Sequence, residues 1–122
     1  MKSLVIDDSM TMRRILRSYI EANDIEVVEA KDGCDALEKL EEGNDFTFAL
    51  IDWDMPRMNG FEFVKAVRAK PEYNDLTLMM VTSHNSMDDI AAAIEEGSND
   101  FLMKPFTEEM VTDKLRMLGF VN

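Results

Sequence analysis

An apolar run that stops at an acidic residue most constrains the fold of this chain. Residues 46–51 are almost wholly apolar, Asp52 ends the run, and Asp54 and Pro56 follow. A run of this kind predicts a strand covered on both faces, as in a parallel sheet, and Pro56 cannot continue the strand ladder. Chemistry in open parallel sheets lies at the carboxyl ends of the strands. The sequence therefore predicts that Asp52 is a reacting group or a metal ligand.

The rest of the chain repeats a strand followed by a helix. Apolar segments of strand length occur at 2–6, 26–30, 46–52, 76–81 and 100–103. Each precedes a segment whose apolar residues recur at helical spacing. Five such repeats with short connections predict an α/β fold, a doubly wound (βα)5 parallel sheet of five strands with right-handed crossovers. The flavodoxin-like strand order 2-1-3-4-5 is expected, with residues 1–122 as a single domain.

Local signals mark where helices begin. Ser9 and Thr107 are expected to cap helices, and Ser86 with Asp89 predicts a capping box. In the helix that follows Ser86, Ile94 is expected to face the core together with residues 90 and 93. Turns are expected at 32–33 and 59–60.

Composition narrows the class of function. The net charge is −12, which argues against a nucleic-acid partner, because a phosphate backbone needs a basic surface. One cysteine, Cys34, excludes an intrachain disulfide and fits a reducing compartment. The apolar start is too short for a signal sequence, and no apolar run approaches membrane length. We expect a soluble, cytoplasmic protein without membrane insertion.

Polar residues of a particular kind end four of the five expected strands. These residues are Asp7 and Asp8, Asp52, Thr82, and Lys104. Several carboxylates at one edge repel each other unless a cation neutralises them. Mg²⁺ prefers oxygen ligands, so Asp8 and Asp52 are candidate direct ligands, with Asp7 acting through water and Mn²⁺ able to substitute. The main-chain carbonyl of Asp54 is a third candidate ligand.

The same residues suit phosphoryl transfer. With a metal bound, a spare oxygen of Asp52 can attack phosphorus and form an aspartyl phosphate. Phosphoryl transfer depends mainly on positioning and charge neutralisation. Lys104 and the Thr82 hydroxyl could each take one phosphoryl oxygen.

At these positions the chain resembles the receiver domain of two-component response regulators. The resemblance runs from about residue 2 to the last helix. It is carried by the segments Val5-Ile6-Asp7-Asp8-Ser9, Asp52-Trp53-Asp54-Met55-Pro56 with Asn59-Gly60, Val81-Thr82-Ser83, and Lys104-Pro105-Phe106. In size, in Trp53 and in lacking an output domain, the chain is most similar to the stand-alone chemotaxis regulators of this family.

The resemblance implies a role for each residue. Asp52 is the phosphoacceptor for a CheA-like sensor histidine kinase, and Asp7, Asp8 and Asp52 form the Mg²⁺ pocket. Thr82 and Lys104 bind the phosphoryl group, and the Lys104–Pro105 bond is cis. Thr82 and an aromatic residue form the switch. Phe101 fills that aromatic position, which is often tyrosine in the family.

The implied protein is a signalling monomer rather than an enzyme. Phosphorylation is expected to change the surface formed by the last two helices and the strand between them. A flagellar motor switch protein or a phosphatase is the implied target. Asp54 and His84, each two residues past a site residue, occupy positions that resemble those tuning dephosphorylation.

Three alternatives stay open. A receiver of this kind could instead pass its phosphoryl group onward in a phosphorelay. A haloacid-dehalogenase-like phosphatase also uses Asp-x-Asp, but places it on the first strand and needs further acidic ligands. A pure interaction module would not need the intact set of acidic residues, threonine and lysine.

Overall fold

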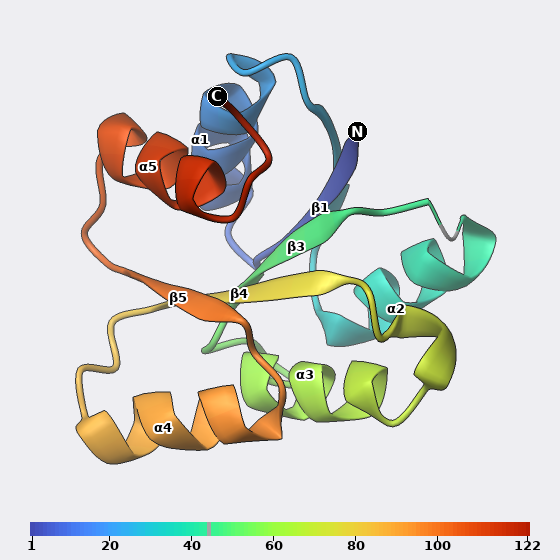
Figure 1. Cartoon of the computed structure of the whole chain (residues 1–122). Helices are drawn as coiled ribbons and strands as arrows, with labels where there is room; N and C mark the ends of the chain where they lie inside the picture. Colours follow the sequence, from blue (N-terminus) through green and yellow to red (C-terminus); the bar gives the residue numbers. More distant parts are fainter. Residues whose placement is uncertain (44) are drawn as a thin grey trace.

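The computed structural model describes residues 1–43 and 45–122, in which strands and helices alternate (Figure 1). In chain order the elements are β1 (Lys2–Ile6), α1 (Met10–Glu21), β2 (Glu26–Ala30), α2 (Gly33–Glu42), β3 (Phe48–Asp52), α3 (Gly60–Arg68), the 3₁₀ helix η1 (Pro71–Tyr73), β4 (Thr77–Thr82), α4 (Met87–Glu96), β5 (Asp100–Met103) and α5 (Glu108–Met117). The predicted strand–helix repeat is confirmed, although β3 begins at Phe48 rather than at residue 46. In the part of the chain described, no helix is long and apolar enough to cross a membrane.

The sheet is parallel throughout and has the order β2-β1-β3-β4-β5, which confirms the predicted topology. β3 lies in the middle, and every residue of it is buried, which explains its continuous apolar run. In the strand register Asp52 pairs with Val81, and Thr82 pairs with Met103. Asp52, Thr82 and Lys104 therefore reach the same end of the sheet. Crossovers leave β1 and β3 in opposite directions, so the topological switch point lies between these two strands.

Helices cover both faces of the sheet (Figure 1). α1 and α5 lie on one face, and α2, α3 and α4 lie on the other. Successive side chains of a strand point to opposite faces. β3 accordingly gives Phe48 and Leu50 to the core beneath α1 and α5, and Ala49 and Ile51 to the core above the other helices. Burial on both faces fixes the position of the carboxyl end of β3.

Two predicted helix caps are confirmed. The Ser9 hydroxyl accepts a hydrogen bond from the Met12 N–H at 3.2 Å and begins α1. The Thr107 hydroxyl accepts one from the Met110 N–H, also at 3.2 Å, and begins α5. Each cap satisfies an N–H group that the helix itself leaves without a partner.

The turns predicted at 32–33 and 59–60 are wrong, because both segments begin helices. Asp32 caps α2 by accepting a hydrogen bond from the Asp35 N–H at 2.8 Å. Asn59 and Glu62 form a reciprocal capping box at the start of α3, with bonds of 2.8 and 3.0 Å. Asparagine and aspartate favour turns and helix caps for the same reason, since their short side chains bond nearby main-chain groups.

The predicted capping box of α4 is also wrong. Ser86 is the N-cap residue but makes no side-chain capping bond. The Asp89 carboxylate instead lies 3.1 Å from Nδ1 of His84. Ile94 was expected in the core but is 43% exposed, whereas Ala93 is buried. Successive residues of a helix are rotated by about 100°, and the buried face of α4 is narrow. Ala93 lies on this face, and Ile94 lies beside it toward solvent.

One arginine links several segments at the amino-terminal end of the sheet, opposite the end that carries Asp52. Arg68, the last residue of α3, donates hydrogen bonds to the main-chain oxygens of Tyr73, Leu76 and Gly97 at 2.8, 2.7 and 3.0 Å. It also donates to Oδ1 of Asn99 at 2.9 Å. These contacts join the ends of α3 and α4 to the segments that lead into β4 and β5.

Replacing Arg68 with methionine should lower the free energy of unfolding by about 2 kcal/mol, because several carbonyls lose a charged donor. Urea denaturation followed by circular dichroism measures the change. The control is Arg14→Met, which removes the same charge from an exposed position and should change stability by less than about 0.5 kcal/mol. Equal midpoints for the two variants would contradict a structural role for Arg68.

Candidate metal and phosphoryl site

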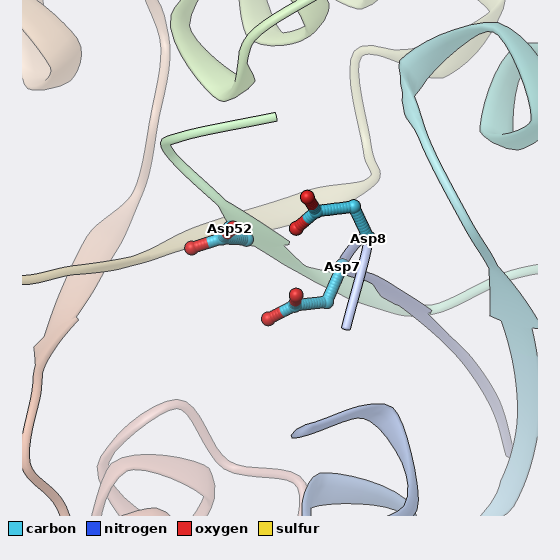
Figure 2. Close-up of side chains that lie close together, drawn as sticks. All are labelled: Asp7, Asp8 and Asp52. Carbon is cyan, nitrogen blue, oxygen red and sulfur yellow. The ribbon is translucent and has the colours of Figure 1, made fainter. Parts of the chain in front are cut away.

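Three carboxylates converge at the carboxyl ends of β1 and β3. Each of Asp7, Asp8 and Asp52 offers one oxygen, and these oxygens lie within 4.8 Å of one another. Figure 2 shows the three side chains side by side at the switch point. Asp7 and Asp52 are buried, whereas Asp8 is exposed. The structure therefore brings together the three acidic residues that the sequence analysis assigned to a metal pocket.

The negative charge of the cluster is only partly balanced, because Lys104 pairs with Asp52 while Asp7 has no paired cation among the described residues. Burial raises the pKa of Asp7 from 3.8 to about 6, and the nearby carboxylates of Asp52 and Asp8 contribute to the rise. Among the described residues, Oδ2 of Asp7 is buried without a hydrogen-bond partner. Burial also raises the pKa of Asp52, although Lys104 opposes this shift. An orphaned buried oxygen beside two further carboxylates fits a hard divalent cation such as Mg²⁺.

Within residues 1–43 and 45–122, Lys104 supplies the cation that contacts Asp52. Its Nζ lies 2.7 Å from Oδ1 of Asp52, and its side chain extends from the segment that follows β5. The main-chain N–H of Lys104 donates to the carbonyl of Thr82 at 2.8 Å, which ties this segment to the end of β4. The peptide bond between Lys104 and Pro105 is cis, as predicted.

Thr82 is buried at the end of β4, next to the residue that pairs with Asp52. Its hydroxyl oxygen accepts a hydrogen bond from the main-chain N–H of His84 at 2.8 Å. The hydroxyl therefore has a partner of its own on the β4–α4 loop. It remains free to donate its proton to an oxygen placed beside it.

A glycine allows α3 to begin close beneath Asp52. The Gly60 N–H donates to the carbonyl of Trp53 at 2.8 Å. A Cβ atom at Gly60 would lie only 2.5 Å from the carbonyl oxygen of Asp52. Any larger residue would push the main chain that carries the carboxylate, so Gly60 helps to set the position of Asp52.

Asp54 and His84, which were predicted only as two separate modulating positions, lie in direct contact. Nε2 of His84 lies 3.0 and 3.2 Å from the two carboxylate oxygens of Asp54, and Nδ1 contacts Asp89. Hydrogen bonds to Asp54 and then Asp89 raise the pKa of His84. The Trp53 ring stacks on the imidazole with centroids 4.7 Å apart. The contact of Asp89 with His84 was not predicted, because the spacing of Asp89 from Ser86 also fits a capping box.

Phe101 lies away from the acidic cluster, on β5. It is half-buried and lines a hollow of about 290 Å³ between β5 and α5. Nζ of Lys114 lies 5.1 Å above the centre of its ring, and the same ammonium pairs with Asp100 at 2.9 Å. The ring is thus held at the surface by a cation on its face.

The fold and the carboxylate cluster together define a class of protein. The chain belongs to the response regulator receiver domain family, which matches residues 3–116. It is therefore a receiver of two-component signalling, and the haloacid-dehalogenase-like alternative is set aside.

Among relatives of this family, the chain is most usefully compared with CheY proteins. It is 40% identical over 116 residues to a chemotaxis protein CheY homolog of Campylobacter jejuni, covering 94% of this chain and 89% of that protein. It is 38% identical over 119 residues to chemotaxis protein CheY1 of Helicobacter pylori strain J99, covering 97% and 96%. The structure of Vibrio cholerae CheY4 superposes with a TM-score of 0.89 at 34% identity, covering 95% and 96%.

Proposed function

We propose that Asp52 accepts a phosphoryl group from a phosphohistidine on a sensor kinase, with Mg²⁺ held by Asp7, Asp8 and Asp52. The observation that supports this most is the convergence of the three carboxylates beside Lys104, 2.7 Å from Asp52, in a receiver domain. The main-chain carbonyl of Asp54 is a further candidate metal ligand. A bound Mg²⁺ ion would align phosphoryl and carboxylate oxygens and neutralise their charge.

Asp52, Lys104 and Thr82 each have a separate role in the transfer of the phosphoryl group. A carboxylate oxygen of Asp52 forms a bond to phosphorus while the phosphorus–nitrogen bond of the donor breaks, and the imidazole nitrogen keeps the electron pair. The Lys104 ammonium balances the negative charge that gathers on the phosphoryl oxygens. The Thr82 hydroxyl donates a hydrogen bond to one of those oxygens. Water later hydrolyses the acyl phosphate and restores the carboxylate.

The signal is a change of charge that moves two side chains. A phosphoryl group adds about 1.5 to 2 negative charges and three acceptor oxygens. Thr82 turns toward these oxygens, and Phe101 moves into the space that opens. The surface formed by α4, β5 and α5 then binds a downstream target. Its exposed methionines, Met87, Met110 and Met117, suit an adaptable contact.

The pathway that fits best is chemotaxis, because the relatives named above are chemotaxis proteins. On this reading the chain acts as a monomeric, cytoplasmic, stand-alone receiver. Its donor is a CheA-like kinase, and its target is a flagellar motor switch protein or a phosphatase. Asp54 and His84 tune the lifetime of the acyl phosphate, since their side chains are paired and the charge of Asp54 acts on Asp52.

Phosphotransfer profiling tests the proposal. The purified protein is incubated with radiolabelled histidine kinases from the source organism, with either Mg²⁺ or EDTA. We expect rapid transfer from one kinase with Mg²⁺ and none with EDTA. A chemotaxis kinase as the preferred donor supports the assigned pathway, whereas onward transfer to a second histidine protein would indicate a phosphorelay. Absence of label from every kinase and from acetyl phosphate would identify an interaction module instead.

A further inference from the structure

An arginine outside the acidic cluster contacts the main chain between two of its members. Nη1 of Arg13, in the first turns of α1, donates a hydrogen bond of 2.7 Å to the main-chain oxygen of Asp7. Nε of the same guanidinium bonds the Glu29 carboxylate on β2 at 3.1 Å. Both side chains are mostly buried, with 16% and 24% exposed. The guanidinium therefore spans from β2 to the loop that carries Asp7 and Asp8.

The oxygen that Arg13 holds belongs to the peptide unit that joins Asp7 to Asp8. The plane of this peptide sets the direction of both side chains, because it fixes one backbone dihedral of each residue. The loop is already held at the Asp7 N–H, which donates to the carbonyl of Ala30 at 3.1 Å. The Ser9 N–H also holds Oδ1 of Asp7 at 2.9 Å. Arg13 adds a third contact, at the carbonyl oxygen of the peptide that joins Asp7 to Asp8.

We propose that Arg13 is a positioning residue for the metal site, which directs the carboxylates of Asp7 and Asp8 toward Asp52 by fixing the peptide between them. This inference rests on the proposed function, because it assumes that the cluster binds Mg²⁺. Groups that orient metal ligands typically change metal affinity by about 10–100-fold when they are removed.

The sign of the effect separates positioning from simple electrostatics. Arg13 carries a positive charge close to an acidic site, and that charge opposes the binding of another cation. If Arg13 acted through charge alone, its removal would strengthen Mg²⁺ binding. If it positions the ligands, its removal weakens binding although the site becomes more negative.

Arg17 provides a matched control on the same helix. Nη1 of Arg17 donates a hydrogen bond to Glu29 at 2.8 Å, so both arginines bond the same carboxylate. The two side chains also carry the same charge. The contacts of Arg17 run to Glu29 and Glu21. Arg17→Met therefore removes a charge and an ion pair to Glu29 while leaving the Asp7 carbonyl bonded to Arg13.

The experiment is a titration of metal-free wild type, Arg13→Met, Arg13→Lys and Arg17→Met with MgCl₂ at fixed ionic strength. Isothermal titration calorimetry gives the dissociation constants, and circular dichroism verifies that each variant is folded. We expect Arg13→Met to bind Mg²⁺ about 10-fold more weakly. Arg17→Met should bind as wild type or more tightly.

The lysine variant keeps the proposal testable if the methionine variant is poorly folded. Arg13→Lys retains the charge, but its donors all lie on one nitrogen, whereas arginine bonds Glu29 and Asp7 through two separate nitrogens. We expect weaker Mg²⁺ binding, between that of wild type and that of Arg13→Met. Wild-type or tighter affinity in both Arg13 variants would overturn the positioning role alone. A wild-type protein that binds no Mg²⁺ would overturn the metal site itself, and this inference with it.

Discussion

Asp52→Asn is expected to abolish phosphorylation of the protein by acetyl phosphate in the presence of Mg²⁺. The amide nitrogen cannot replace the attacking carboxylate oxygen, and the change also removes the negative charge that Lys104 holds at 2.7 Å. Intact-protein mass spectrometry measures the gain of one phosphoryl group. Reduction of the acyl phosphate with borohydride, followed by peptide mapping, then locates the modified residue.

The matched control for this experiment is Asp54→Asn. It makes the same chemical change two residues later, at a side chain that faces His84 rather than Lys104. This variant should still gain a phosphoryl group, although the group should be lost at a different rate. Unchanged labelling of Asp52→Asn would falsify the assignment of Asp52 as the nucleophile.

Asp7→Asn should make the metal-free protein more stable at pH 7.5, by about 3 kcal/mol. The pKa of Asp7 is about 6 in the folded protein and 3.8 ordinarily, a difference that corresponds to about 3 kcal/mol. Because the folded pKa is the higher one, the protonated Asp7 carboxyl is the form that favours folding. Its stabilising contribution is fully present below pH 3.8 and is lost as pH rises through about 6. The advantage of asparagine should therefore be largest above pH 7 and small near pH 4.

Urea denaturation in EDTA at several pH values measures this difference. Asp75→Asn is the control, because it removes one negative charge from an exposed position and so accounts for the general repulsion in a chain of net charge −12. Saturating Mg²⁺ should stabilise wild type and leave Asp7→Asn almost unchanged, since a ligand stabilises only a state that binds it. Equal stability of wild type and Asp7→Asn in EDTA at pH 7.5 would contradict the high pKa.

The prediction for Asp7 comes from a conflict in the acidic cluster. The carboxylates that give the site its affinity for a cation also repel each other when no cation is present. Oδ2 of Asp7 has no partner among the described residues, so the fold carries a strained group at the position where we place the metal. Local violations of good packing and charge balance of this kind are typical of functional sites.

The predictions that failed at helix starts share a physical cause. Asp89 had two possible partners, a main-chain N–H three residues away or the His84 ring, and the sequence alone favoured the nearer one. The structure pairs it with His84 at 3.1 Å. Likewise, Asp32 and Asn59 carry side chains that suit both turns and helix caps, and only the path of the following segment distinguishes them.

The amino-acid sequence determined the strand–helix repeat, the buried character of β3 and the acidic, hydroxyl or lysine residues at the ends of four of the five strands. These features follow from local periodicity and from the rule that strand ends in a parallel sheet share one edge. Only the tertiary structure decided that Lys104 lies 2.7 Å from Asp52, that Asp54 meets His84, and that Arg13 bonds the peptide after Asp7. Such contacts join segments that several elements position together, and no local pattern specifies distances between them.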